Sequence, residues 1–215
     1  MSTVKQLKLA PGVHAEDVVQ ELEGFTDGKA RVVVIEAGAT QDFGAWPGEL
    51  VRWLWQDYPL PVIFAFDKQL IGEEAALALG CDIRICDEGA AIQLNGGTMD
   101  KLTAARACTL LQLETVESIP AKLTGAQALE DGLVSRVGPK GSARELAKEV
   151  AEVIATRGPI ATRLAKEALW RGLNQPLEQA LRFETDLTLL LQATKDRQEG
   201  VRAFLEKRPP KFIGE

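Results

Sequence analysis

The stretch that decides the fold is Pro61–Cys86, which reads PVIFAFDKQLIGEEAALALGCDIRIC. Its first part, Val62–Phe66, is a continuous apolar run of the kind found in strands that are buried on both faces of a parallel sheet. Its middle part, Glu73–Gly80, is rich in alanine and leucine and predicts a helix. Its last part, Cys81–Cys86, alternates in polarity and predicts another strand. A strand, a helix and a strand in this order indicate a right-handed crossover unit.

The same alternation continues toward the N-terminus. Ala30–Ala37 is rich in β-branched residues and predicts a further buried strand. Ala15–Glu23 before it has apolar residues at helical spacing, and Gly48–Gln56 after it predicts a helix with an apolar inner face. That helix must end before Pro61, because a proline disfavours helical geometry in the residue that precedes it. We therefore expect an α/β fold built on a parallel sheet.

From Asp100 onward the pattern becomes helical, and no linker rich in proline, glycine and serine separates the two halves. We expect an α/β core over residues 1–140 and a helical region over residues 141–215. The segment Leu177–Gln192 is apolar around much of its circumference, so either this domain or another subunit must cover it. Helices are predicted at Lys101–Leu113, Gly125–Asp131, Ser142–Thr156, Ile160–Gly172 and from Pro176 to about Thr194.

Composition places the chain among ordinary globular proteins. It has 215 residues, of which 46% are hydrophobic and 26% charged, which excludes disorder and a disulfide scaffold. The net charge of −6 works against nucleic-acid binding, which depends on lysine and arginine. No apolar run reaches the roughly 18 residues of a membrane span, and the first residues lack the apolar stretch of a signal peptide. We expect a cytoplasmic protein that binds neither nucleic acid nor a membrane.

Cysteine and histidine offer little chemistry. Cys81, Cys86 and Cys108 stand in apolar surroundings without the spacing of metal ligands, so we expect buried thiols and no metal site. The one histidine, His14, is interpreted as an exposed residue at a helix start. Serine–histidine and cysteine–histidine mechanisms therefore lack a base.

Three motifs resemble the crotonase (enoyl-CoA hydratase/isomerase) superfamily. Pro61–Arg84 is similar to the family's Lys-Pro-Val-Ile-Ala-Ala-Val-Asn-Gly segment with its following helix start and Cys-Asp strand. Lys122–Val134 resembles the Thr-Ala-x-Glu-Ala-x-x-x-Gly-Leu-Val element. The most specific motif is Glu199–Arg208, EGVRAFLEKR, which is similar to the C-terminal Glu-Gly-x-x-Ala-Phe-x-Glu-Lys-Arg signature. The three motifs occur in the same order as in the family. Together they cover about Arg31 to Gly214.

The resemblance implies a core of stacked ββα crossover units, or spiral, with a C-terminal helical trimerisation region, usually as a homotrimer or a hexamer. It implies an acyl-CoA or acyl-carrier thioester as substrate and no separate cofactor. It also implies that two main-chain N–H groups, an oxyanion hole, stabilise the thioester carbonyl as it becomes an enolate, while carboxylates move protons or water.

The resemblance assigns the first oxyanion donor to the Phe43–Leu50 loop. Pro47 has no N–H to donate, so Ala45 or Trp46 would take that role; alternatively, the loop only covers the core with Trp46. The second donor falls at Gln93, with Leu94 as its neighbour.

The family's two catalytic glutamates fall at positions that hold other residues. The first falls at Gly96, so that carboxylate is missing. The second falls near Thr115, and a shift of one or two residues would supply Glu114 or Glu117; if this segment were helical, a shift of one residue would turn the side chain by about 100°. Glu73 and Glu74 stand where the family has two of its glycines, and the helix dipole alone favours acidic residues in a first turn. A carboxylate there, Glu73 in the first place, could also face the acyl pocket.

At the nucleotide end of the ligand, the resemblance assigns binding of coenzyme A to Phe204 and Lys207, in the C-terminal motif of a neighbouring subunit. Lys207, Arg208 and Lys211 can also be interpreted as a solvated basic tail. We expect a hydratase- or isomerase-type enzyme of fatty acid metabolism. The alternative is a catalytically silent crotonase-fold subunit that lacks the hydratase glutamates.

Overall fold

The computed structural model describes residues 3–10, 12–26, 29–37, 48–94, 99–173 and 175–215. The chain divides into two compact units, Met1–Ala151 and Glu152–Glu215. Within the described ranges, no helix is both long enough and apolar enough to cross a bilayer.

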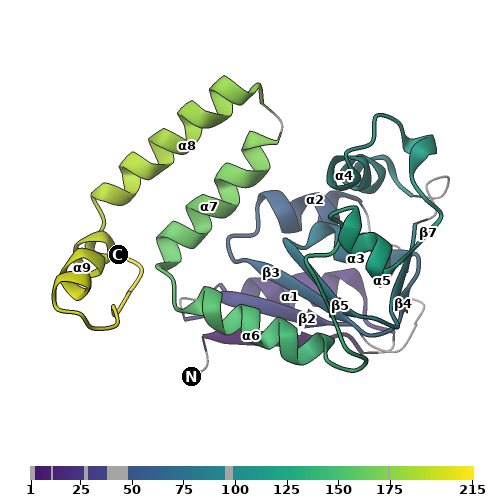
Figure 1. Ribbon diagram of the computed structural model, residues 1–215, viewed down its shortest axis with the longest axis horizontal. Coiled ribbons are helices and arrows are strands. Elements are labelled where there is room, and N and C mark those ends of the chain that lie inside the picture. Colours follow the sequence, from purple (N-terminus) through teal and green to yellow (C-terminus); the bar gives the residue numbers. More distant parts are fainter. Residues whose placement is uncertain (1–2, 11, 27–28, 38–47, 95–98, 174) are drawn as a thin grey trace. The chain divides into compact units, whose positions relative to one another are not determined.

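A five-stranded parallel sheet forms the centre of the first unit (Figure 1). Its strand order is β1-β2-β3-β5-β8, and each neighbouring pair is parallel. The central strand β3 is buried at every position, which confirms the interpretation of its apolar run. The five strands are β1 (Val4–Lys8), β2 (Val32–Glu36), β3 (Val62–Phe66), β5 (Ile83–Asp87) and β8 (Arg136–Gly138).

A second, three-stranded sheet has the order β4-β6-β7. It comprises β4 (Gln69–Leu70), β6 (Ala91–Gln93) and β7 (Lys122–Thr124). β4 and β6 are parallel, whereas β6 and β7 are antiparallel. The chain leaves the large sheet at β3, enters the small sheet at β4 and returns to the large sheet at β5, so the start of the helix between β4 and β5 adjoins the small sheet.

Helices α2, α3 and α4 pack against one another in the first unit (Figure 1). Gly80, the last residue of α3, permits the approach of α2, because a Cβ there would lie 3.1 Å from the carbonyl oxygen of Val51. Every residue of α3 from Glu74 to Gly80 is buried. The helices of this unit are α1 (Ala15–Gly24), α2 (Gly48–Gln56), α3 (Glu73–Gly80), α4 (Lys101–Leu111), α5 (Gly125–Glu130) and α6 (Ala143–Ala155), the last of which continues past residue 151.

The second unit contains three helices in its described part. They are α7 (Pro159–Gly172), α8 (Leu177–Gln192) and α9 (Lys195–Leu205), and α7 packs along α8. The first two confirm the predicted helices to within a few residues at each end. The third helix, α9, is not among the predicted helices. Its residues enter the sequence analysis only through the C-terminal motif Glu199–Arg208.

Several short strands were not predicted, namely β1, β4, β6, β7 and β8. One predicted helix also ends early: α4 stops at Leu111 because Gln112 adopts the left-handed conformation, with φ of 54°. This ending changes the environment of the acidic residues that follow.

Candidate functional site

The start of α3 brings two acidic side chains to the edge of the small sheet. Gly72 precedes the helix with φ of 57° and ψ of −122°, a conformation that side-chain-bearing residues rarely adopt. Glu73 is half-buried, whereas Glu74 is only 3% exposed. The turn at Gly72 therefore directs one carboxylate toward the surface and the next into the protein.

Glu74 is the unusual member of this pair. Its Oε1 atom is buried and has no hydrogen-bond partner among the described residues. Burial raises the pKa of the Glu74 carboxyl to about 7, against a smaller, opposing effect of the Lys68 ammonium group. This carboxyl group can therefore exchange a proton near neutral pH, a property that the sequence pattern at the helix start does not distinguish from that of Glu73.

The opposite end of α3 holds two buried guanidinium groups. Arg84 donates from Nε to the carbonyl of Leu133 at 2.5 Å and from Nη1 to that of Cys81 at 2.6 Å. Arg106 of α4 donates from Nε to the carbonyl of Leu79 at 3.1 Å. Burial lowers the pKa of Arg106 to about 10 and also lowers that of Arg84. These cations satisfy carbonyls at the negative end of the helix dipole.

The small sheet carries a chain of polar side chains beside α3. Lys122 Nζ donates to Gln69 Oε1 at 3.4 Å, and Gln69 Nε2 donates to Gln93 Oε1 at 2.8 Å. Gln69 stands on β4, Gln93 on β6 and Lys122 on β7, so the chain crosses all three strands. It fixes the side chain of Gln93, one of the predicted oxyanion residues.

The main-chain N–H groups of Gln93 and Leu94 point to opposite edges of β6. Leu94 is fully buried, and its N–H donates to the carbonyl of Ala121 at 2.8 Å, on the β7 side. Because N–H directions alternate along a strand, the Gln93 N–H faces the β4 side. The Leu94 N–H is thus engaged with the β7 side, and the Gln93 N–H faces β4, the strand with which β6 pairs on its other edge. The other two predicted donors, Ala45 and Trp46, lie outside the described residues, as do Pro47 and Gly96.

Glu114 and Glu117 follow α4 in the chain and do not stand on it. α4 has already ended at Leu111, and Glu114 lies in an irregular segment before the short 3₁₀ turn Val116–Ser118. Glu114 and Glu117 are both exposed.

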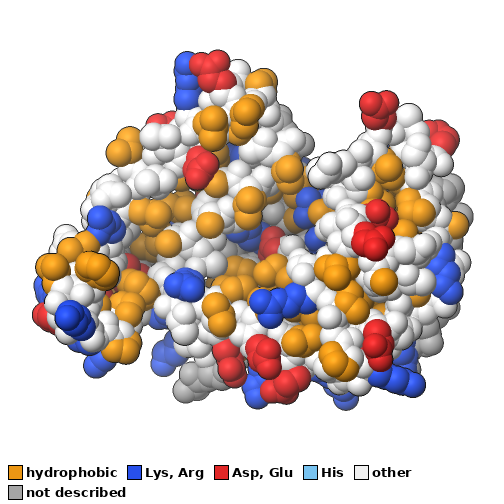
Figure 2. Space-filling view, in the orientation of Figure 1, with side chains coloured by type: hydrophobic (Ala, Val, Ile, Leu, Met, Phe, Trp, Pro, Cys, Tyr) orange, Lys and Arg blue, Asp and Glu red, His pale blue; other side chains and the backbone are white. Residues whose placement is uncertain are grey.

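In the second unit, the predicted coenzyme A ligands lie at the end of α9 and are exposed. Phe204 is 82% exposed, and Lys207 is also at the surface with φ of 53°. The Lys207 N–H donates to the Phe204 carbonyl at 3.2 Å, so one turn presents both side chains to solvent. Hydrophobic side chains are visible over α8 and α9 in Figure 2.

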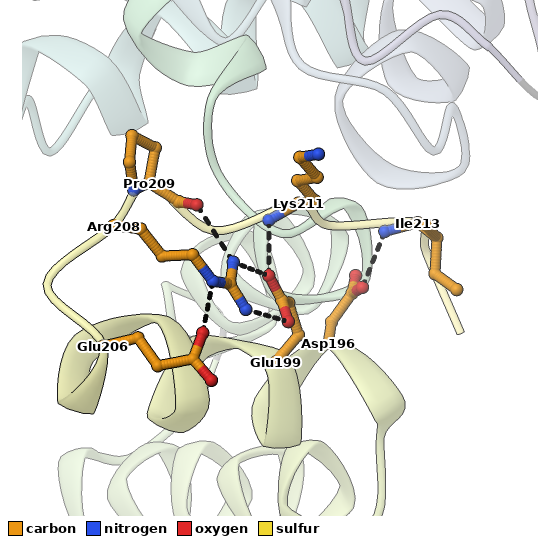
Figure 3. A network of polar contacts seen from close by, with 7 residues as sticks. All are labelled: Asp196, Glu199, Glu206, Arg208, Pro209, Lys211 and Ile213. Carbon is orange, nitrogen blue, oxygen red and sulfur yellow. Dashed lines mark hydrogen bonds and ion pairs between the residues drawn. The ribbon is translucent and has the colours of Figure 1, made fainter.

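A polar network secures the C-terminal tail to α9 (Figure 3). Arg208 forms a two-pronged ion pair with Glu199 at 2.6 and 3.0 Å, and Glu199 also accepts the Lys211 N–H at 2.9 Å. These contacts lower the pKa of Glu199 to about 2, the Arg208 bonds contributing most. Asp196 accepts the N–H groups of two tail residues, at 2.7 and 2.9 Å.

A pocket of about 480 Å³ opens beside this network. Four cationic side chains and two carboxylates line it, and the cations exceed the acids by two. Arg208 and Lys195 are paired with carboxylates. The lining charged residues are Lys195, Asp196, Glu199, Arg202, Arg208 and Lys211. Among the described residues, no group of three or more histidine, cysteine or acidic side chains could hold a metal ion.

Comparison with known proteins gives a consistent result. Residues 49–215 match the family model described as enoyl-CoA hydratase/isomerase. A 2,3-dehydroadipyl-CoA hydratase of Escherichia coli is 33% identical over 186 residues, which is 82% of this chain and 73% of that protein.

Solved structures agree with the sequence relatives. An enoyl-CoA hydratase of Bacillus anthracis superposes with a TM-score of 0.78 at 28% identity, over 97% of this chain and 91% of the other. An enoyl-CoA hydratase subunit of Geobacillus kaustophilus superposes with a TM-score of 0.86 at 25% identity, over 100% and 96% of the two chains. The whole fold, including the helical second unit, therefore has solved counterparts.

Proposed function

The chain belongs to the enoyl-CoA hydratase/isomerase family, and on that premise we propose that it acts on an acyl-coenzyme A thioester by stabilising the enolate of its acyl group. The single observation that carries this proposal is the family match over residues 49–215, which includes both the small sheet and the C-terminal motif. Coenzyme A enters as part of the substrate, and the proposed chemistry draws on no further cofactor. The alternative substrate is an acyl thioester that is bound to a carrier protein in place of coenzyme A.

The carboxylates available favour proton transfer over hydration. Hydration requires two carboxylates that hold one water, but the family's two positions hold Gly96 and, nearby, Thr115. The neighbours of Thr115, Glu114 and Glu117, are exposed. Double-bond isomerisation needs only one group that takes and returns a proton. We therefore place isomerisation of an enoyl thioester before hydration.

The proposed oxyanion hole combines an N–H from Ala45 or Trp46 with the Gln93 N–H. Support for Gln93 comes from the side-chain bonds that hold it to its neighbours in the small sheet. Preorganised donors of this kind contribute about 3 to 4 kcal/mol each to the stabilisation of an oxyanion.

For the nucleotide end, we propose that Phe204 stacks on the adenine and that Lys207 binds a phosphate, in a neighbouring copy of the chain. Their exposure supports a role toward another molecule, because Phe204 contributes little to its own unit. A homotrimer or hexamer would supply that neighbour.

The proposal is tested with purified protein and two thioesters. Hex-3-enoyl-CoA should gain the absorbance of a conjugated enoyl thioester as the double bond moves, whereas crotonyl-CoA should lose that absorbance only if the protein hydrates. Binding of butyryl-CoA, measured by calorimetry, is the control for folding and ligand recognition. If butyryl-CoA binds but neither substrate reacts at several chain lengths, the catalytically silent subunit is the correct reading.

A further inference from the structure

Three carboxylates are buried in the described part of the chain, and only one of them has a buried oxygen atom without a hydrogen-bond partner there. Both oxygens of Asp87 and both of Asp196 accept main-chain N–H groups, at 2.7 to 3.0 Å. Glu74 is as buried as these residues, yet its Oε1 has no partner among the described residues. A buried polar atom without a partner costs free energy and calls for a specific explanation.

A structural role does not explain Glu74. Its neighbour Glu73 already places a half-exposed acidic group in the first turn of α3, where the helix dipole favours one. A second acid would be tolerated more easily at the surface than at 3% exposure. The Oε1 atom of Glu74 is therefore available to a donor that the described part of the chain does not provide.

We propose that Glu74 is the catalytic carboxylate that moves a proton on the acyl group, an inference that rests on the proposed function. The Glu74 carboxylate removes a proton from the α-carbon of an enoyl thioester, and the C–H electron pair becomes the C=C bond of a dienolate whose charge rests on the thioester oxygen. Protonated Glu74 then returns the proton to the γ-carbon, and the double bond ends conjugated with the carbonyl. Atoms and charge balance without water or another reactant.

The position of Glu74 fits this role in two respects. Gly72, two residues before it, leaves space beside the main chain, since no described atom lies within 4 Å of where its Cβ would be. β4, which leads into α3, pairs with β6, the strand that carries the proposed donor Gln93. The carboxylate and the donor thus belong to neighbouring segments.

The charged surroundings allow Glu74 to exchange its proton. Lys68, at the turn before β4, is the cation whose field favours the ionised form, and burial opposes it. Glu73 is adjacent on the same helix. Arg84 and Arg106 bind carbonyls at the other end of α3. A carboxyl group that titrates near the working pH serves as both acceptor and donor of the proton.

The test compares Glu74→Gln with Glu88→Gln, which makes the same change at an exposed site on the turn between β5 and β6. Isomerisation of hex-3-enoyl-CoA should fall about 100-fold or more in Glu74→Gln, in kcat rather than KM. It should stay within about twofold in Glu88→Gln. The wild-type rate should rise with pH through a midpoint near 7, and the residual rate of Glu74→Gln should be flat. Glu74→Asp, which keeps a carboxylate, should retain more activity than Glu74→Gln.

The outcomes separate the two proposals. A wild-type protein that isomerises hex-3-enoyl-CoA, with a Glu74→Gln variant that is equally active, overturns the role of Glu74 and leaves the proposed function intact. Loss of activity in Glu73→Gln but not in Glu74→Gln has the same meaning and moves the role to the neighbour. A wild-type protein without activity on any enoyl thioester overturns the proposed function, and the role of Glu74 with it. Unchanged binding of butyryl-CoA in Glu74→Gln excludes misfolding as the cause of a loss.

Discussion

At the scale of single residues, Glu74 is a group whose burial should weaken the folded state. Its pKa is about 7 in the folded protein and 4.5 for an ordinary glutamate, so the folded chain binds more protons between these values. The free energy of unfolding should therefore fall as pH rises from about 4.5 to 7, and stay lower above that range. A shift of this size corresponds to about 3 kcal/mol as an upper figure.

The consequence is that Glu74→Gln should stabilise the protein at pH 8 and change its stability little at pH 4. Urea unfolding at both pH values measures this difference, with Glu88→Gln as the exposed control. An equal effect of Glu74→Gln at the two pH values would show that the Glu74 pKa is close to normal. Gain of stability together with loss of activity is the pattern expected where a functional group is held in an unfavourable place.

The choice between Glu73 and Glu74 shows where sequence reasoning ends at this scale. Both are acidic and both occupy a first turn, so helix periodicity and dipole arguments treat them alike. The difference arises from the turn at Gly72 and from the packing of α3, which depend on tertiary contacts. Periodicity likewise did not show that the left-handed Gln112 ends α4 and leaves Glu114 exposed in an irregular segment.

At the scale of elements, α3 is a buried helix with charges matched to its two ends. Its C-terminal carbonyls accept from Arg84 and Arg106, so the guanidinium groups replace water in the core. Arg84→Met would keep the volume of the side chain but remove donors to the carbonyls of Ala78, Cys81 and Leu133.

Arg84→Met should lower the free energy of unfolding by about 3 kcal/mol, because each buried carbonyl without a donor costs roughly 1 to 3 kcal/mol. Chemical denaturation measures the change, and Arg136→Met on the exposed face of β8 serves as the control. Equal stability of Arg84→Met and Arg136→Met would show that other donors replace the guanidinium.

The elements predicted from sequence and those missed differ in length and burial. β3, α2 and α3 were predicted at their observed bounds, because each has a continuous or periodic apolar pattern and a clear end. β4, β6, β7 and β8 have two or three residues each, which is too short for a periodic signal. β4, β6 and β7 exist because the second sheet pairs segments that are distant in sequence, and β8 exists because it pairs with the distant β5 at the edge of the first sheet.

At the scale of the whole molecule, sequence reasoning reached the α/β class and the helical C-terminal region because both rest on long periodic segments. It could not assign partners to the apolar residues of α8, because a helix covered by its own chain and one covered by another chain have the same pattern. In the structure, these residues remain largely at the surface: Leu177, Leu181, Leu189 and Leu190 are between 54% and 75% exposed.

Exposed leucines on a long helix lead to the last prediction, that the chain is an oligomer. Large apolar side chains that no described part of the chain covers indicate a partner surface, and a homotrimer or hexamer is the assembly that we propose. Light scattering should give a mass that is three or six times 23.3 kDa for the wild type. Leu181→Glu together with Leu189→Glu should reduce the mass, because a buried carboxylate at an interface is costly.

The matched control is Gln179→Glu, which adds the same charge at an exposed polar position of α8 and should leave the mass unchanged. Since Phe204 and Lys207 are proposed to bind coenzyme A on a neighbouring copy, the double leucine variant should also bind butyryl-CoA at least about tenfold more weakly. A wild type that is monomeric at micromolar concentration and still binds butyryl-CoA would contradict both the assembly and the placement of these two residues. In that case the ligand contacts would have to come from within one chain.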